Sequence, residues 1–196
     1  MDLVIIKYNA GNIQSVLNAL ERLGVQARVT DDAASIRSAD KVIFPGVGEA
    51  SSAMNSLREN QLDQLIGELG QPVLGICVGM QLLCTHSEEN DTDCLGIIPV
   101  RVKKFSAGSE GLKVPQMGWN TIYRLRSPLF TGIHNDSYIY NVHSYYAEDS
   151  DHTIAVCKYG IEYAAAVKKD NFYGVQFHTE KSADTGDRII KNFLEL

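Results

Sequence analysis

Short apolar runs alternate with amphipathic stretches in the first half of the chain. Residues 3–6, 41–44 and 71–74 carry such runs. A strand that is apolar along its whole length is typical of a parallel sheet covered on both faces. Residues 25–29 alternate like a further strand. Because strands and helical segments alternate, we predict parallel pairing with right-handed crossovers, and this half of the chain is expected to be α/β.

Two helices are predicted between these strands. The first covers residues 13–23, with Asn12 as its N-cap and Gly24 as its C-terminal stop. The second covers residues 51–69. Their apolar residues recur at helical spacing; they are Ile13, Val16, Leu17, Leu20 and Leu23 in the first, and Met54, Leu57, Leu62, Leu65, Ile66 and Leu69 in the second.

From residue 97 to residue 167 the pattern changes to short strands separated by Gly, Pro, Asn and Asp. They are expected to pair antiparallel and to extend or flank the parallel sheet. A strand at 172–177 and a helix at 184–194 follow, and the absence of a long linker predicts a single domain over residues 1–196. The candidate strands are residues 100–105, 119–123, 138–142, 153–156 and 162–167.

The composition narrows the possible functions. The chain has 196 residues, a net charge of -6 and four cysteines. An acidic protein of this kind is not expected to bind nucleic acid or an anionic membrane, since both reward basic patches. No apolar run has the length of a transmembrane helix, and the N-terminus starts with a strand rather than a signal peptide. The cysteines lack zinc-site spacing, so we expect reduced thiols in a cytoplasmic enzyme, with no metal.

The stretch Gly75-Ile76-Cys77-Val78-Gly79 lies between a predicted strand and the start of a helix. Gly-x-Cys-x-Gly at such a junction is the thiol counterpart of the Gly-x-Ser-x-Gly nucleophile elbow. The glycines permit a sharp turn that presents the middle side chain from a strained backbone. N–H groups at the helix start favour a thiolate there. Cys77 is therefore a candidate nucleophile; the alternative is a buried structural cysteine.

A second motif, His178-Thr179-Glu180, ends the strand predicted at residues 172–177. A nucleophilic cysteine needs a base within hydrogen-bond reach, and the base needs a third group that holds its tautomer. Residues two apart at a strand's end point the same way, so Glu180 can orient His178 while His178 faces Cys77 on a neighbouring strand. The two motifs together predict a Cys-His-Glu triad.

A third stretch, Pro45-Gly46-Val47-Gly48, follows the 41–44 strand at the edge where Cys77 is expected. Alone it is a plain Pro-Gly turn. Beside an elbow it is the natural source of one backbone N–H of an oxyanion hole, the other being that of Val78.

Gly75-Ile76-Cys77-x-Gly79-Met80-Gln81, followed at a distance by His178-x-Glu180-Lys181-Ser182, resembles the class I (triad) glutamine amidotransferases. Met117-Gly118-Trp119-Asn120 is similar, more narrowly, to the glutaminase subunits of imidazole glycerol phosphate synthase. The resemblance covers essentially the whole chain. It implies a flavodoxin-like fold with a mostly parallel central sheet, helices on both faces and antiparallel strands in the second half. It also implies hydrolysis of L-glutamine to glutamate and ammonia.

The resemblance assigns roles to individual residues. An oxyanion amide comes from Val47 or Gly48, and their loop helps to seat the glutamine. A carboxylate can pair with the α-ammonium group of free glutamine. The implied catalytic residues are Cys77, His178 and Glu180; the oxyanion hole is formed by Val47, Gly48 and Val78; and the substrate is bound by Gly46, Gln81, Glu89, His143, Ser144 and Tyr145.

The resemblance also implies a partner. The ammonia would pass to a separate (β/α)8 cyclase subunit, in a heterodimer that closes the imidazole ring in histidine biosynthesis. Weak activity is expected until the cyclase is bound and loaded with substrate, and no cofactor is expected. The residues that would face the partner are Gly11, Asn12, Trp119, Asn120 and Lys181.

Three positions depart from the family pattern. Thr179 stands where Pro is usual, and it should be tolerated at a modest cost if the backbone adopts the same φ. Gln116 replaces a usual His, and Asn141 replaces an apolar aromatic residue. We expect the last two to alter the docking face or the tunnel mouth.

Other functions fit parts of the same pattern. A glutaminase of another synthase, such as that of pyridoxal phosphate or of a surface-sugar pathway, would share the triad, although the former should lack the Asn12 and Trp119-Asn120 signatures. A thiol peptidase or a glyoxalase-like protein would not need Gln81 or a C-terminal His-x-Glu. A catalytically dead interaction subunit could keep the docking residues, and Thr179 is its only support.

Overall fold

Five parallel strands form the centre of the molecule in the computed structural model, which describes residues 1–9, 12–106 and 112–196. The order is β2-β1-β3-β4-β13, with every neighbouring pair parallel. This is the flavodoxin-like order, so the expected parallel α/β core is confirmed. Gly11, expected at the partner-facing surface, lies outside the described residues. The strands are β1 (Leu3–Ile6), β2 (Arg28–Thr30), β3 (Lys41–Gly46), β4 (Val73–Cys77) and β13 (Phe172–Val175).

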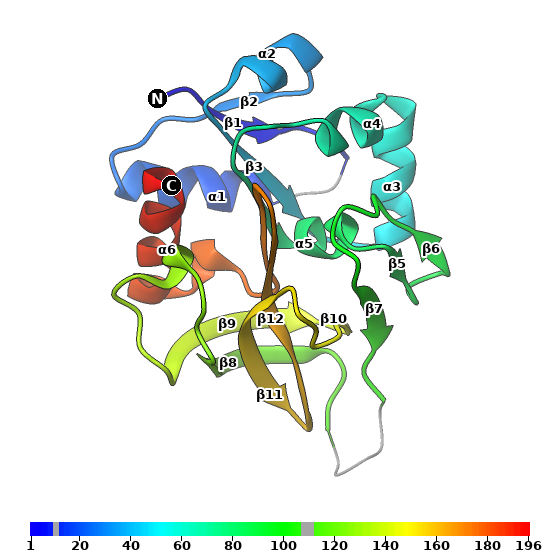
Figure 1. Ribbon diagram of the computed structural model, residues 1–196, viewed down its shortest axis with the longest axis vertical. Coiled ribbons are helices and arrows are strands. Elements are labelled where there is room, and N and C mark those ends of the chain that lie inside the picture. The colour runs from blue at the N-terminus through cyan, green and yellow to red at the C-terminus, as the bar shows by residue number, and fades with distance from the viewer. Residues whose placement is uncertain (10–11, 107–111) are drawn as a thin grey trace.

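Helices cover both faces of these strands. Figure 1 shows α1 (Ile13–Arg22) and α6 (Ala183–Glu195) on one side, and α3 (Ala50–Glu59) and α5 (Val78–Leu83) on the other. The Asn12 side chain accepts a hydrogen bond from the Ser15 N–H at the start of α1, which confirms its role as N-cap. The α1 residues Val16, Ala19 and Leu20 are buried against the sheet. Both faces of the parallel strands are therefore covered, which explains their continuous apolar runs.

Some predicted boundaries in this half are wrong. The helix expected at 51–69 is two helices, α3 and α4 (Leu62–Gly67), because Gln61 adopts a left-handed conformation with φ 56° between them. The strand expected at 25–29 begins only at Arg28. A short helix, α2 (Ala33–Ser38), was not predicted; it begins where the Asp32 carboxylate accepts the Ser35 N–H.

Antiparallel strands extend the sheet beyond β13, as predicted. The strand β12 (Ile161–Lys169) pairs antiparallel with β13, and the sheet continues antiparallel through β10 (Tyr145–Ala147) and β7 (Arg101–Lys104). Beyond β7, β5 (His86–Ser87) pairs parallel with it and forms a short hairpin with β6 (Thr92–Asp93). A branch leaves β12 through β11 (Thr153–Tyr159), β8 (Gln116–Tyr123) and β9 (Ser137–His143), at the lower end of the molecule in Figure 1. The branch strands are longer than predicted, and β5, β6 and β10 were not predicted.

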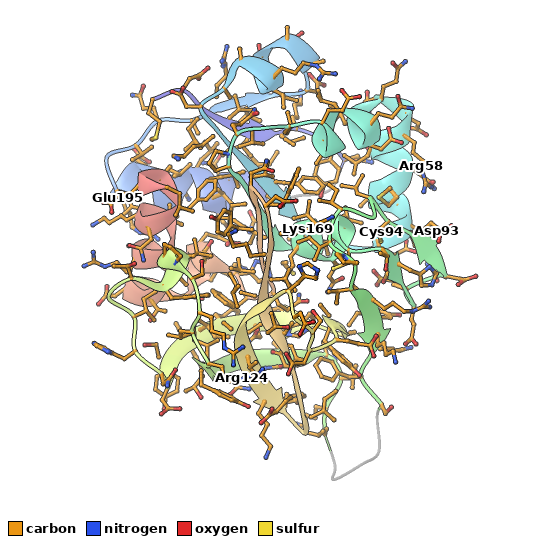
Figure 2. All side chains as sticks on the ribbon, viewed as in Figure 1. Arg58, Asp93, Cys94, Arg124, Lys169 and Glu195 are labelled. Carbon is orange, nitrogen blue, oxygen red and sulfur yellow. The ribbon has the colours of Figure 1, made fainter. Side chains whose placement is uncertain are left out.

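Large apolar side chains fill the space between the sheet and the helices (Figure 2). Phe44, Phe177 and Tyr163 are fully buried, and every residue of β1, β3 and β4 is buried. Burying a side chain of this size stabilises the fold by about 1.5–3 kcal/mol. The carboxyl end of β4, which carries Cys77, is therefore packed against a rigid interior.

Candidate active site

A cavity of about 340 Å³ opens at the carboxyl ends of β3 and β4. Ligands bind at this edge in open α/β sheets. Gly46 lies beside Cys77 in the β3–β4 register but does not line the cavity, and Glu180 lies behind His178. The lining residues are Val47, Gly48, Cys77, Val78, Gln81, Glu89, Pro115, Val142, His143, Ser144, Tyr145, His178 and Lys181.

Cys77 lies at the junction of β4 and α5, as the elbow motif predicted. Its φ of 55° and ψ of −112° place a non-glycine residue in a strained conformation. The side chain is buried, and Sγ lies 3.9 Å from the carbonyl oxygen of Val142. The turn depends on close backbone approach, because a Cβ atom at Gly79 would lie 2.0 Å from the carbonyl oxygen of Phe44. The fold therefore maintains backbone strain at one thiol, which is typical of a functional site.

His178 and Glu180 form a hydrogen-bonded pair beside this thiol. The Nδ1 atom of His178 donates to Oε1 of Glu180 over 2.7 Å, and both side chains are almost fully buried. Burial lowers the pKa of His178, but hydrogen bonds to Cys77 and Glu180 outweigh it and raise that pKa to about 10. Because Nδ1 is occupied by Glu180, Nε2 is the atom left to face the thiol.

The backbone of His178 is held by β9 and by Ser182. The His178 N–H donates to the carbonyl oxygen of Tyr140, and the Ser182 hydroxyl donates to the carbonyl oxygen of His178. Thr179 begins the short helix η2 (Thr179–Lys181), and Gly186 in α6 allows close approach to its carbonyl oxygen. With Thr179 in place, the His178–Glu180 contact still forms.

Replacing Glu180 with glutamine should reduce glutamine hydrolysis by about 10³-fold, because the imidazole loses both its charge partner and its fixed tautomer. Removing one of the groups that raise the pKa of His178 should also move the alkaline limb of the pH–rate profile to lower pH. Initial rates of glutamate release across pH measure both effects. Glu148→Gln, at a half-exposed surface ion pair, is the matched control. An unchanged pH profile in Glu180→Gln would contradict this role.

The loop between β3 and α3 faces Cys77 across the cavity. Val47 and Gly48 line the cavity, Gly48 has a φ of +94°, and Val78 is the first residue of α5. The Tyr8 hydroxyl donates to the carbonyl oxygen of Pro45 over 2.7 Å, which ties this loop to the end of β1. The residues expected to supply oxyanion N–H groups therefore border the same space as the thiol.

Two expected substrate contacts have side chains already engaged in the protein. The Nε2 atom of Gln81 donates to the carbonyl oxygen of Tyr145 and to Oε1 of Gln176, so Gln81 can offer a ligand only its oxygen. The His143 ring is buried against Tyr163, and burial lowers its pKa to about 4, so the ring is neutral. His143 can therefore contribute its backbone, whereas Ser144 and Tyr145 are partly exposed to the cavity.

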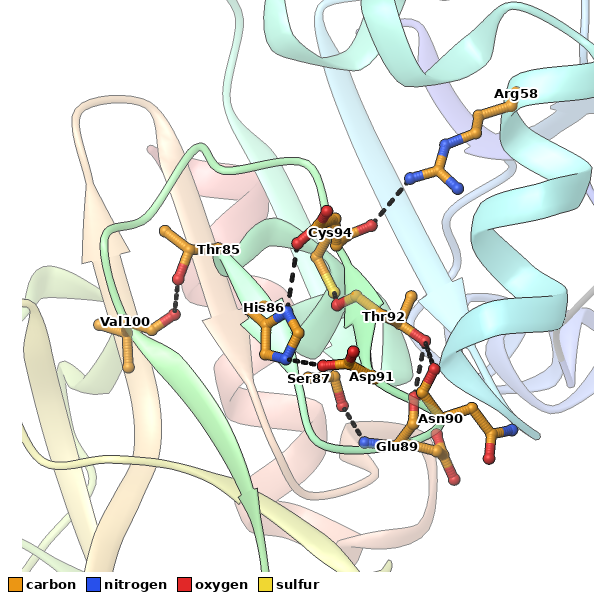
Figure 3. A network of polar contacts seen from close by, with 11 residues as sticks. Arg58, Thr85, His86, Ser87, Glu89, Asn90, Asp91, Thr92, Cys94 and Val100 are labelled. Carbon is orange, nitrogen blue, oxygen red and sulfur yellow. Dashed lines mark hydrogen bonds and ion pairs between the residues drawn. The ribbon is translucent and has the colours of Figure 1, made fainter.

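Glu89 is placed by the β5–β6 hairpin rather than by a solvated loop. Its N–H donates to the Ser87 hydroxyl, and its carboxylate accepts the N–H of Ala50 at the start of α3. Figure 3 shows the His86 ring beside the hairpin, where it contacts the carboxylates of Asp91 and Asp93. Arg58 reaches from α3 and donates to the carbonyl oxygen of Asp93. Burial raises the pKa of Glu89, although the Ala50 N–H opposes this. The hairpin therefore points one carboxylate into the cavity.

The expected partner-facing residues divide between two surfaces. Trp119 is 54% exposed on the outer face of the β8–β9 ribbon, edge-on to Tyr140. Asn120 points to the other face, where its amide donates to the carbonyl oxygen of Lys158. Lys181 is exposed at the cavity rim, and α1, which Asn12 caps, packs against η2. Trp119 and Lys181 are thus both exposed, whereas the Asn120 side chain turns away from the face that carries Trp119.

Gln116 and Asn141 do not lie at an exposed face, and their expected effect on the docking face or the tunnel mouth stays a prediction. Both are buried on the inner face of the β8–β9 ribbon. The Tyr163 hydroxyl donates to Oε1 of Gln116 over 3.0 Å. Among the described residues, no group is within hydrogen-bond reach of the Asn141 amide. These substitutions therefore change the interior beneath the ribbon.

Sequence patterns missed three residues that shape the site: Tyr8, Gln176 and Ser182. Tyr8 fixes the loop opposite the thiol, and Ser182 fixes the backbone of His178. Gln176 lies within 3.8 Å of the Cys77 sulfur. Tyr8 and Gln176 were signalled only as polar residues near the carboxyl end of a predicted strand, and Ser182 only as the last residue of the His178-x-Glu180-Lys181-Ser182 motif, with no role attached.

Comparison with known proteins decides the family. Residues 4–196 match the family described as Glutamine amidotransferase class-I. The chain belongs to this family. Imidazole glycerol phosphate synthase subunit HisH of Bacteroides fragilis is 57% identical to it over 196 residues, covering 100% of both chains. The protein of that name from Bacteroides thetaiotaomicron is 54% identical over the same length, again with 100% coverage. The sequence-based assignment of this glutamine amidotransferase, including its narrower likeness to the synthase glutaminases, is confirmed.

Solved structures show the same amidotransferase fold. PurLQS from Thermotoga maritima aligns with a TM-score of 0.72 and 16% identity, over 99% of this chain and 97% of that chain. A structure described as a glutamine amidotransferase aligns with a TM-score of 0.76 and 17% identity, over 100% and 98% of the two chains. The fold is therefore shared at low sequence identity.

Within residues 1–9, 12–106 and 112–196, no helix of this amidotransferase is long and apolar enough to cross a membrane. The same residues contain no group of three His, Cys, Asp or Glu side chains placed to hold a metal ion.

Proposed function

We propose that this protein is the glutaminase subunit of an imidazole glycerol phosphate synthase, acting as one domain in a cytoplasmic heterodimer with the cyclase subunit. The observation that supports it most is the Cys77–His178–Glu180 constellation at the cavity of a full-length relative of HisH proteins. An enzyme of another class with a similar triad would not be expected to share 57% of its residues with a HisH protein over the whole chain. The residue roles below are part of the proposal.

The reaction is hydrolysis of the side-chain amide of L-glutamine. His178 takes the proton of the Cys77 thiol, and the thiolate attacks the amide carbon. The carbonyl oxygen becomes an oxyanion held by the N–H of Val78 and by an N–H of Val47 or Gly48. His178 donates a proton to the leaving nitrogen, and ammonia departs. His178 then takes a proton from water, which attacks the thioester and releases glutamate.

The remaining cavity residues position the substrate. The Glu89 carboxylate and the Gln81 oxygen both accept hydrogen bonds, so they suit the α-ammonium group. The backbone of His143, Ser144 and Tyr145 binds the α-carboxylate, and Gly46 gives the opposite loop its close approach to α5. The cavity of about 340 Å³ is of a size that suits a single amino acid.

The released ammonia is proposed to pass directly to a cyclase barrel, because ammonia lost to bulk water would be protonated. The exposed apolar face formed by Met117, Trp119 and Tyr138 lies on the ribbon that holds the His178 backbone. Large exposed apolar side chains gathered on one face favour a protein partner. Lys181 and Asn12 would complete this surface.

The test is glutamate release from glutamine by the protein alone, with its cognate cyclase subunit, and with the cyclase and its nucleotide substrate. Weak activity alone and strong stimulation only with both additions are expected. Robust activity that the cyclase leaves unchanged would keep the triad chemistry but point to another synthase. Folded protein that is inactive under all three conditions would overturn the proposal.

A further inference from the structure

Gln176 is fully buried immediately after β13, two residues before His178. Its Nε2 atom lies 3.8 Å from the Cys77 sulfur, which is within hydrogen-bond range for sulfur. We propose that Gln176 is a catalytic hydrogen-bond donor to the Cys77 sulfur, separate from His178, that stabilises the thiolate and fixes its position. This inference rests on the proposed role of Cys77 as nucleophile.

The orientation of the Gln176 amide decides whether it helps or opposes a thiolate, because its nitrogen donates and its oxygen only accepts. The two ends of a carboxamide are assigned from the hydrogen-bond network around them. In this network one group is unambiguous, because it is a backbone carbonyl. The carbonyl oxygen of Tyr145 lies 3.1 Å from the Gln81 amide, and a backbone carbonyl can only accept.

The Gln81 nitrogen must therefore face Tyr145. The same nitrogen lies 2.9 Å from the Gln176 amide, so the Gln176 atom that faces it must be the oxygen. The nitrogen of Gln176 is then left to face Cys77. The Gln81 nitrogen thus donates both to the Tyr145 carbonyl oxygen and to the Gln176 oxygen, and the Gln176 nitrogen donates onward to the Cys77 sulfur.

The hydrogen-bond partner that suits the Cys77 sulfur changes when the thiol loses its proton. In the thiol form, S–H can donate to the carbonyl oxygen of Val142, 3.9 Å away. In the thiolate form, that oxygen offers nothing to the sulfur, whereas the Gln176 N–H becomes a charge-assisted donor. Since the amide chain is buried and pre-oriented, the donor is in place before glutamine arrives.

The test is the rate of Cys77 alkylation by iodoacetamide as a function of pH, resolved by peptide mass spectrometry so that the other three cysteines do not contribute. In Gln176→Met, which keeps the bulk but has no N–H, we expect the pH at half-maximal rate to rise by about one unit. Gln176→Glu keeps the shape, loses the donor and adds a charge, so its midpoint should rise at least as far. Gln71→Met is the matched control, since the Gln71 amide donates to the carbonyl oxygen of Ile36 and not to the sulfur.

A second variant tests the orientation argument. Gln81→Met removes the group that fixes the Gln176 amide, so the midpoint should rise by less than in Gln176→Met. Because Gln81 acts through Gln176, adding Gln81→Met to Gln176→Met should cause no further rise. Additive shifts would show that Gln81 acts on the thiol by another route and would overturn the orientation argument.

Midpoints in Gln176→Met and Gln176→Glu that equal that of the wild type, with unchanged melting temperatures, would overturn the proposal. If Gln176→Met does not fold, the shape-preserving Gln176→Glu decides alone. The readout needs no glutamine, so it is independent of the proposed function. A shifted midpoint in a protein that never hydrolyses glutamine would sustain the role of Gln176 and refute the glutaminase assignment.

Discussion

Replacing Cys77 with alanine should reduce glutamine hydrolysis by about 10⁴-fold or more, because no other group near the amide carbon can form the covalent intermediate. The neighbouring side chains remain: His178 and Glu180 keep their 2.7 Å contact. Cavity shape and substrate binding should persist. In the complex with the cyclase, synthesis supplied with free ammonia should be nearly unchanged, because that route bypasses the thiol. Both rates are measured on one preparation.

Cys84→Ala is the control for this prediction. Cys84 is also a buried cysteine near α5, but its thiol donates to the carbonyl oxygen of Met80 and lies away from the cavity. Its removal should leave the glutamine-dependent rate within a few-fold of the wild type. If Cys77→Ala retained substantial glutamine-dependent synthesis, the thiol could not be the nucleophile. If it lost the ammonia-dependent rate as well, its effect would be structural.

Gly79→Ala should destabilise the protein by about 3 kcal/mol or prevent folding. The added Cβ would lie 2.0 Å from the carbonyl oxygen of Phe44, and backbone atoms cannot move aside as a flexible side chain can. The clash would push the first turn of α5 away from β3. Since Cys77 and Val78 open that turn, the strained elbow and one oxyanion N–H would be displaced together. Urea unfolding and the glutaminase rate measure the two effects.

Gly67→Ala is the matched control, because Gly67 is the last residue of α4 and a Cβ there would meet nothing within 4 Å. Alanine is the better helix former, so this change should be neutral or stabilising by up to about 1 kcal/mol. If Gly79→Ala were as stable as Gly67→Ala, β3 and α5 could not pack as closely as described.

The parallel core could be predicted because β1, β3 and β4 are buried at every residue and therefore read as apolar runs, whereas β2, which is partly exposed, was placed only approximately. The break between α3 and α4 could not, since neither Gly nor Pro marks it and a left-handed Gln61 makes the turn. The helix α2 is six residues long, too short for periodicity to show, although its capping residue Asp32 gave a local signal. The short strands β5, β6 and β10 depend on pairing partners far along the chain.

The triad could be predicted because each member sits in a short motif at the end of a strand. Gln176 and Tyr8 could not be assigned a role, since their contacts join segments far apart in the sequence and depend on where side chains point. For Gln81, too, the sequence could not show where the side chain points. Its motif placed it at the site, but only the structure shows that its nitrogen is committed to Tyr145 and Gln176.

In the proposed reaction, Cys77 forms a covalent bond with glutamine. The most direct measurement exposes the complex with the cyclase to a diazoketone analogue of glutamine, which alkylates a nucleophile at the reactive amide position, and maps the modified residue by peptide mass spectrometry. We predict that Cys77 alone is labelled, that excess glutamine protects it, and that Cys84, Cys94 and Cys157 stay unmodified. Labelling at another residue, or labelling of Cys77 that glutamine does not prevent, would show that Cys77 is not the nucleophile that attacks glutamine.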